Sequence, residues 1–266
     1  HDGIEGAPKR VILIDQTKKS IRNAVNYLGL EDAIHAMYAE GEDAKALGID
    51  ADALSRRCTA CGGSGLLRLD MGFLPDILDA CEACGGSGYP DELRSLTLQG
   101  VALPDFFALS VDQVLARFMN AGGLADSLKL LQEAGLGYLT LRQPGHALSG
   151  GEAQRLKMVD ELSRRKRKEE PTLYILDEPT LGLHLEDVDR LTGMLRRLLE
   201  NRRNTVVIVE HHTHLLVACD WLVELGPVGG PDGGHLVAQG TPEQVAEGTS
   251  ATAPFLKALL QKEGGR

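Results

Sequence analysis

The sequence predicts an α/β fold in which a parallel sheet with helices carries an inserted metal-binding module. Three short runs of apolar and β-branched residues predict strands of that sheet, at residues 11–14, 172–176 and 205–209. Such runs are typical of strands that a parallel sheet buries on both faces. A stretch with helical spacing, residues 185–199, lies between the last two. Two Cys-x-x-Cys pairs after the first strand predict the module.

Composition sets the class of protein. The chain has 266 residues, of which 43% are hydrophobic and 25% charged, which is ordinary for a globular protein with one large domain and an insertion. Its longest apolar runs are strand-sized and no leader pattern is visible, so we expect no membrane span and a cytoplasmic location. The net charge of −10 argues against a protein that coats DNA with its whole surface, although a local basic face is compatible with it.

The cysteines form the most specific metal pattern. Cys58, Cys61, Cys81 and Cys84 have the spacing C-x2-C-x19-C-x2-C, and both pairs continue as Gly-Gly-Ser-Gly. Four thiolates suit tetrahedral Zn²⁺ and leave no open position, so the predicted zinc is structural. Free thiols or a redox pair are the alternative interpretation.

A second motif predicts a nucleotide site. Ser149 and Glu152 have the spacing of a capping box, and Gly150 and Gly151 lie between them, where a helix N-terminus favours an anion. The strand at 172–176 is followed by Asp177 and Glu178, at the carboxyl end where parallel sheets bind ligands.

These motifs carry a family resemblance. The stretches LSGGE and LYILDEPTLGLH resemble the signature loop and Walker B region of ABC-type ATPases. The longer stretches LSGGEAQRLK and TLYILDEPTLGLH resemble the UvrA family, the damage-recognition subunits of bacterial nucleotide excision repair. The resemblance implies the C-terminal ATPase domain of that family, a P-loop NTPase-like sheet truncated at its N-terminus. It divides the chain into a partial ATPase core with the Q-loop (1–54), a zinc module (55–92), a signature subdomain (93–168) and an ATPase core with Walker B and the switch histidine (169–266).

The resemblance also implies residue roles, with ATP, Mg²⁺ and Zn²⁺ as cofactors. Asp177 holds Mg²⁺, and Glu178 orients and deprotonates the attacking water. Gln16 and His211 complete the shell of the γ-phosphate. The run from Ser149 through Gly150 and Gly151 to Glu152 serves an ATP bound across a dimer interface.

Two departures from the family pattern matter. The phosphate cradle GxxxxGK[ST] does not occur in the sequence, and in the family it precedes the Q-loop. We therefore expect a fragment that is inactive alone, with the first ATPase domain and the docking region for a UvrB-like subunit outside it. The segment after Gln16 keeps only Asn26, Tyr27 and Gly29 of a family loop, and His212 stands where Asn is usual.

The favoured function is an ATPase that dimerises and clamps damaged double-stranded DNA, with the zinc module sensing distortion. A drug-resistance or self-protection paralogue of UvrA is an alternative within the family. From another class, the Cys-x-x-Cys-x-Gly-x-Gly repeat would fit a non-hydrolytic, zinc-dependent binding module like that of DnaJ chaperones. A transporter ATPase would leave the four-cysteine insertion unexplained. The basic run at 164–168 is either a solvated helix face or a phosphate contact.

Further elements are expected along the chain. Helices are expected at 30–37, 111–119 and 124–134, and a loop after the first of them that contains Gly41 and Gly48. A hairpin is expected around Gln99 and Gly100, a late strand at 218–225, and an edge strand followed by a turn at 236–242.

Overall fold

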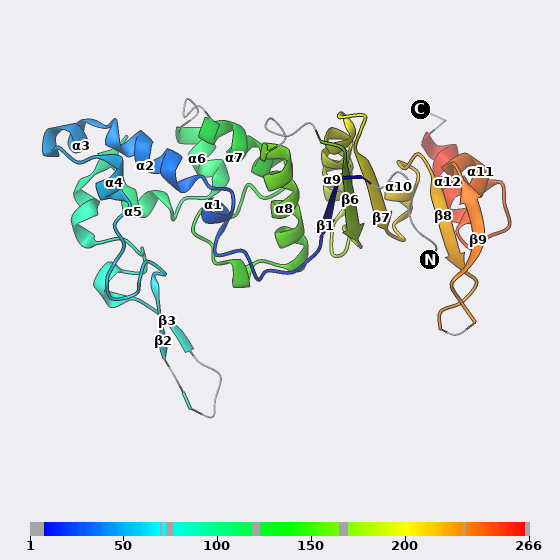
Figure 1. Ribbon diagram of the computed structural model, residues 1–266, viewed down its shortest axis with the longest axis horizontal. Helices are drawn as coiled ribbons and strands as arrows, with labels where there is room; N and C mark the ends of the chain where they lie inside the picture. The colour runs from blue at the N-terminus through cyan, green and yellow to red at the C-terminus, as the bar shows by residue number, and fades with distance from the viewer. Residues whose placement is uncertain are drawn as a thin grey trace. The chain divides into compact units, whose positions relative to one another are not determined.

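The computed structural model describes residues 8–69, 71–72, 77–118, 123–164, 170–230 and 232–263. The chain divides into two compact units, one made of His1–Asp15 with Arg167–Arg266 and the other of Gln16–Lys166 (Figure 1). Each unit is described by itself. The finer division into four parts stays a prediction.

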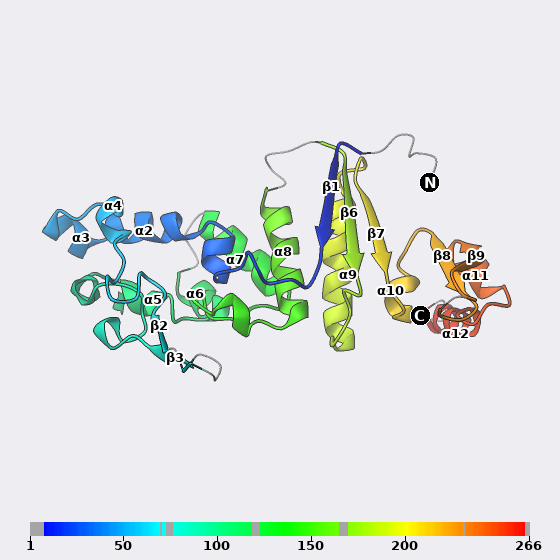
Figure 2. The ribbon, with the colours of Figure 1, turned by 60° about the horizontal axis from the view of Figure 1, so that its bottom comes forward.

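The first unit is built on a three-stranded parallel sheet in the order β1-β6-β7 (Figure 2). Its strands are β1 (Arg10–Ile14), β6 (Thr172–Asp177) and β7 (Thr205–Val209), and helix α9 (Leu185–Leu199) connects the last two. The register pairs Ile14 with Leu176 and Asp177 with Val209. The three predicted strands and the helix at 185–199 are confirmed.

The expectation that these strands are buried on both faces is wrong. Along β6 buried residues alternate with half-buried ones, and β7 has no buried residue. The side chains of Val11, Leu13 and Val209 are 57%, 59% and 57% exposed. The face of the sheet that carries these three side chains is exposed, because no described element of this unit packs over that face.

The end of the chain forms a small core of its own. It contains α10 (Thr213–Leu216), the antiparallel pair β8 (Leu222–Gly226) and β9 (His235–Gly240), α11 (Pro242–Ala246) and α12 (Ala253–Glu263). Leu222, Val245, Ala246 and Leu256 are buried together. The strand expected from 218 begins at Leu222, because residues 218 and 219 form hydrogen-bonded turns after α10. The last strand ends at Gly240, because Thr241 caps α11 in a capping box with Gln244.

The second unit is mainly helical. Its helices are α1 (Ala24–Tyr27), α2 (Glu31–Ala39), α3 (Glu42–Leu47), α4 (Ala51–Leu54), α5 (Leu103–Phe106), α6 (Val111–Arg117), α7 (Gly123–Glu133) and α8 (Gly150–Arg164). Short 3-10 turns are η1 (Glu82–Cys84), η2 (Asp91–Ser95) and η3 (Gly145–Ala147). Rings of Tyr38, Phe106 and Phe118 meet edge to face in its core, with centroids 5.1–5.7 Å apart.

The helices expected at 30–37, 111–119 and 124–134 are confirmed with small shifts at their ends. The loop expected after the first is wrong, because α3 and α4 lie there. Gly41 and Gly48 are the caps of α3, and Asp50 caps α4 by accepting from the amide of Ala53 at 2.8 Å. Both glycines mark helix ends rather than a loop.

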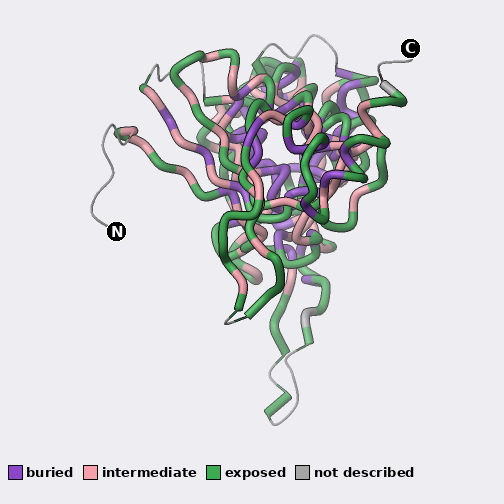
Figure 3. The backbone as a smooth tube through the Cα atoms, turned by 90° about the vertical axis from the view of Figure 1, so that its right-hand side faces the viewer, coloured by how far each residue is buried: buried purple, intermediate pink, exposed green. Residues whose placement is uncertain are grey.

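Two hairpins complete the unit. Strands β4 (Thr97–Leu98) and β5 (Val101–Ala102) pair across Gln99 and Gly100, so the predicted hairpin is confirmed with strands of only two residues. Strands β2 (Leu66–Leu69) and β3 (Ile77–Ala80) pair between the two cysteine repeats. Their described residues are mostly exposed, as the lowest part of Figure 3 shows.

Candidate functional sites

The four cysteines gather at one point. Their sulfur atoms all lie within 4.8 Å of one another, with Cys58 Sγ 3.9 Å from Cys81 Sγ and Cys61 Sγ 3.8 Å from Cys84 Sγ. A zinc ion bound tetrahedrally at about 2.3 Å from each sulfur would hold the sulfurs about 3.8 Å apart. The donor set and its spacing therefore fit a structural zinc ion.

The two cysteine repeats bond to each other through reciprocal backbone hydrogen bonds. The amide of Cys58 donates to the carbonyl of Gly88, and the amide of Cys81 donates to the carbonyl of Gly65, both at 2.9 Å. A Cβ on Gly65 would lie 2.3 Å from the carbonyl oxygen of Gly86, so no larger residue fits there without a backbone shift. The repeat of 23 residues in the sequence is thus a repeat in space.

Backbone amides donate to two of the sulfurs and favour the thiolate form. The amide of Gly65 donates to Cys61 Sγ and the amide of Gly88 to Cys84 Sγ, both at 3.3 Å. Burial opposes ionisation of Cys61, but the amides of Gly65 and Gly63 outweigh it and lower the pKa of this thiol to about 7. Thiolates are the form that binds zinc.

A polar cluster, partly buried, holds the base of this module. Arg57, next to the first cysteine, pairs with Glu31 on α2 at 2.7 Å. Tyr89, which follows the second repeat, donates to Glu31 Oε1 at 3.2 Å, and its hydroxyl lies 3.0 Å from His35 Nε2. Its ring stacks on Phe107 with centroids 5.1 Å apart. Both ends of the module are thereby tied to the helices.

The signature helix α8 begins as predicted. The amide of Ser149 donates to Glu152 Oε2 at 2.6 Å and the amide of Glu152 to Ser149 Oγ at 3.1 Å, so the capping box is confirmed. Burial tends to raise the pKa of Glu152, but hydrogen bonds from Tyr138 and Ser149 outweigh it and lower this pKa. The carboxylate is therefore ionised at the N-terminus of the helix.

Gln16 lies against the same turn. A Cβ on Gly150 would lie 2.4 Å from Gln16 Oε1, so the Gln16 side chain lies directly against the start of the helix. The structure thus brings Gln16 and the signature residues together within the second unit.

The acidic strand end lies in the first unit. Asp177 is the last residue of β6, beside Val209 at the end of β7, and the amide of Glu178 donates to the carbonyl of Val209 at 2.9 Å. His211 follows two residues after Val209, and its side chain is 77% exposed. Asp177, Glu178 and His211 therefore lie at the same carboxyl edge of the sheet, where α/β folds bind ligands. Their catalytic roles stay predictions.

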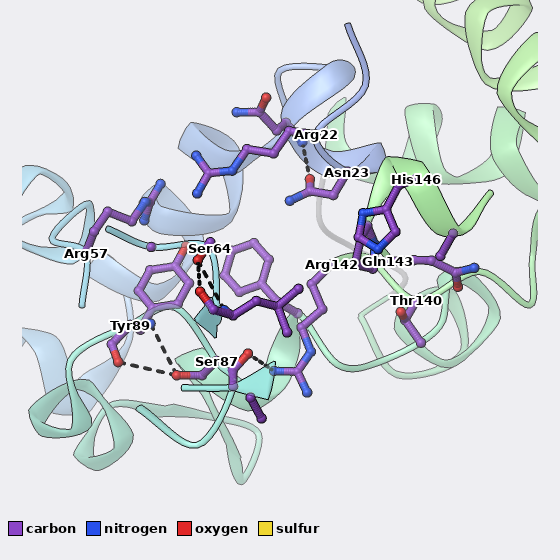
Figure 4. Close-up of a pocket in the computed structure, with 18 of the residues that line it drawn as sticks. Arg22, Asn23, Arg57, Ser64, Ser87, Tyr89, Thr140, Arg142, Gln143 and His146 are labelled. Carbon is purple, nitrogen blue, oxygen red and sulfur yellow. Dashed lines mark hydrogen bonds between the residues drawn. The ribbon is translucent and has the colours of Figure 1, made fainter. Parts of the chain in front are cut away.

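A basic groove was missed from the sequence (Figure 4). It has a volume of about 830 Å³, and its charged lining consists of four arginines, one histidine and one carboxylate, namely Arg22, Arg57, Arg68, Arg142, His146 and Glu31. Glu31 pairs with Arg57, so the groove is net positive. The sequence gives no local signal for it, because its residues come from segments spread between Arg22 and Ala147.

The basic run at 164–168 lies largely outside the described residues. Of this run only Arg164 is described, and its Nε donates to Asp160 Oδ1 at 2.7 Å on the same helix. Residues 70 and 73–76, between β2 and β3, also lie outside them. In the described parts of the chain, no helix is long and apolar enough to cross a membrane.

Comparison with known proteins shows which proteins the chain is similar to. The chain is 41% identical over 263 residues to UvrABC system protein A of Thermus thermophilus and 40% identical over 271 residues to that of Aquifex aeolicus, covering 96% and 98% of the chain. It matches the crystal structure of UvrA2 from Deinococcus radiodurans with a TM-score of 0.82 and 40% identity over 94% of the chain. No family model matches it. Over nearly its whole length, the chain is a homologue of UvrA proteins.

The chain spans less than a third of the length of the relatives it matches. It covers 27% and 29% of the two curated relatives and 32% of the UvrA2 chain. The α/β fold with a parallel sheet and an inserted four-cysteine module, expected from the sequence, is confirmed by that match. Identity over nearly the whole chain favours UvrA over the chaperone-like module, which would account for the cysteine repeats alone.

Proposed function

We propose that this chain is the nucleotide-hydrolysing and DNA-contacting part of a UvrA-like damage-recognition ATPase of nucleotide excision repair. The observation that carries the proposal is the shared carboxyl edge of β6 and β7, which holds Asp177, Glu178 and His211 together. An ATPase needs a metal ligand, a base and a group that senses the γ-phosphate, and these three residues supply one of each.

In this proposal Asp177 holds Mg²⁺, which neutralises charge on the phosphates when bound. Glu178 orients the attacking water and accepts its proton, and His211 orients that water against the γ-phosphate. Gln16 contributes to the metal and phosphate shell. The capped turn from Ser149 through Gly150 and Gly151 to Glu152 contacts the ATP of a second ATPase domain, in a homodimer or within one longer chain. The chain alone is inactive, because it carries no phosphate cradle.

The zinc ion has a structural role in the proposal. Cys58, Cys61, Cys81 and Cys84 would hold it, and their spacing supports this. With four protein ligands the ion has no position for a substrate. It keeps the base of the β2–β3 hairpin in one conformation.

Damaged double-stranded DNA is the proposed substrate. The groove at Arg22, Arg57 and Arg142 concentrates positive charge in a chain whose net charge is −10, and DNA phosphates are the natural ligand for such a surface. A UvrB-like subunit is the proposed partner, and the cytoplasm the proposed location.

The test is retention of DNA by the full-length polypeptide that contains this chain. Labelled duplexes with and without a bulky adduct are bound to the protein with ATP, with ADP or without nucleotide, and the bound fraction is measured by gel shift. The proposal predicts preferential binding of the damaged duplex that depends on the nucleotide. Equal binding of both duplexes under all conditions would contradict it.

A further inference from the structure

Glu210 is a buried carboxylate to which the proposed mechanism gives no task. It follows β7 directly, and its side chain is 1% exposed. Burying a carboxylate is costly unless hydrogen bonds replace its water. Three donors do so here: the amide of Thr180 at 3.2 Å and the Thr180 hydroxyl on Oε1, and the amide of His211 at 2.9 Å on Oε2.

These donors come from two different loops. Thr180 belongs to the loop after β6, two residues beyond Glu178, whereas His211 belongs to the loop after β7. Each loop carries one proposed catalytic group. The Glu210 carboxylate therefore ties together the backbones that present Glu178 and His211.

The tie matters because Glu178 has an unusual backbone. Its φ is +43°, a left-handed conformation that residues with a side chain rarely adopt and that the surroundings must hold. The amide of Glu178 donates to Val209, and the amide of Leu181 donates to the carbonyl of Glu178 at 3.1 Å. The bonds from Thr180 to Glu210 complete this fixation on the far side of the turn.

We propose that Glu210 is a positioning residue for ATP hydrolysis, acting through Thr180 to fix Glu178 and through the His211 amide to fix the histidine. The inference rests on the proposed function, since it assigns a task only if Glu178 and His211 act on ATP. His211 Nδ1 lies 3.6 Å from Glu210 Oε2, too far for a hydrogen bond, so the backbone of His211 carries the contact.

The chain offers a matched control. In the same unit, Glu224 Oε1 on β8 accepts from the amide of Thr252 at 3.4 Å and from its hydroxyl at 2.8 Å. Thr180→Val and Thr252→Val each remove one threonine hydroxyl from a glutamate carboxylate. Only the first lies in a loop that carries a proposed catalytic residue.

The first measurement is steady-state ATP hydrolysis by the full-length polypeptide. We expect Thr180→Val to lower kcat between about 10- and 100-fold, as displaced catalytic groups do, with KM for ATP changed less than about twofold. Thr180→Ser keeps the hydroxyl and should restore most of kcat. Thr252→Val should leave kcat unchanged. A kcat for Thr180→Val equal to that of Thr252→Val would overturn the inference while leaving the proposed function intact.

The second measurement does not depend on activity. Amide hydrogen exchange of residues 178–183 in the chain without nucleotide should be faster in Thr180→Val than in the unmodified chain, with residues 222–226 unchanged. Unchanged exchange at 178–183 would overturn the inference whatever the protein hydrolyses. If the unmodified full-length polypeptide does not hydrolyse ATP although the exchange changes as expected, the proposed function fails and the catalytic task of Glu210 fails with it, while the structural tie stands.

Discussion

His35 is buried among groups that hold the zinc module, with Nε2 3.0 Å from the Tyr89 hydroxyl. Burial lowers its pKa below 6.5, Glu31 and Asp32 oppose this, and Arg57 adds to it. The folded chain therefore takes up this proton at a lower pH than the unfolded chain does. At residue scale, one imidazole makes the attachment of the module sensitive to acid.

The sign of the pH effect follows. Between the unfolded pKa near 6.5 and the lower folded pKa, the unfolded chain binds more protons, so the free energy of unfolding falls as the pH is lowered through this window. We expect the urea midpoint of the second unit to fall from pH 7.5 to pH 5.5, and to fall less in His35→Gln. Fluorescence of a probe attached to that unit would report its unfolding by urea. An equal fall in both proteins would contradict the assignment.

At the scale of elements, motifs defined by short spacings in the sequence were the ones that could be predicted. The capping box of Ser149 and Glu152 and the convergence of four cysteines follow from spacing alone, since both depend on residues that a single turn or a repeat brings together. The exposure of β7 could not be predicted, because burial depends on what packs over the sheet. The groove was missed for the same reason, because only the tertiary fold brings Arg22 and Arg142 to the lining of one groove.

The first element-scale prediction concerns the metal. The purified chain should contain about one zinc ion, because four thiolates close one tetrahedral site. Cys84→Ser should lose it, and Cys219→Ser, outside the cluster, should keep it. Metal analysis by mass spectrometry decides the matter. Retention of zinc by Cys84→Ser, or loss of zinc by Cys219→Ser, would count against the site.

The second element-scale prediction concerns the contact between the two cysteine repeats. Gly62 and Gly65 have φ values of +60° and +73°, but only a Cβ on Gly65 would meet a backbone carbonyl. Gly62→Ala should cost about 1 kcal/mol through backbone strain, whereas Gly65→Ala should cost more and weaken zinc binding. Competition with a zinc-binding dye measures the affinities. Equal affinities would argue against close packing of the repeats.

At the scale of the whole molecule, charge is separated. The chain carries a net charge of −10, yet the groove gathers four arginines around one paired carboxylate. Screening by salt should therefore weaken DNA binding strongly, because the attraction is local and the remainder of the surface repels phosphate.

This predicts a variant with a defined salt dependence. Arg142→Gln should reduce the slope of log K against log salt by about 0.9, the value for one lost phosphate contact. Arg56→Gln, on an arginine that faces Glu92 and does not line the groove, should leave the slope unchanged. Fluorescence anisotropy with a labelled duplex gives both slopes. Identical slopes for the two variants would remove the groove from the DNA-binding surface.

The most direct test of the account is the rate of ATP hydrolysis by the full-length polypeptide with Glu178 replaced by Gln. The amide keeps the size of the side chain but cannot accept the proton of the attacking water. If the edge formed by Asp177, Glu178 and His211 is the hydrolytic site, Glu178→Gln should lower turnover by at least about 100-fold, as expected for loss of a general base. Turnover equal to that of the unmodified protein would contradict the account.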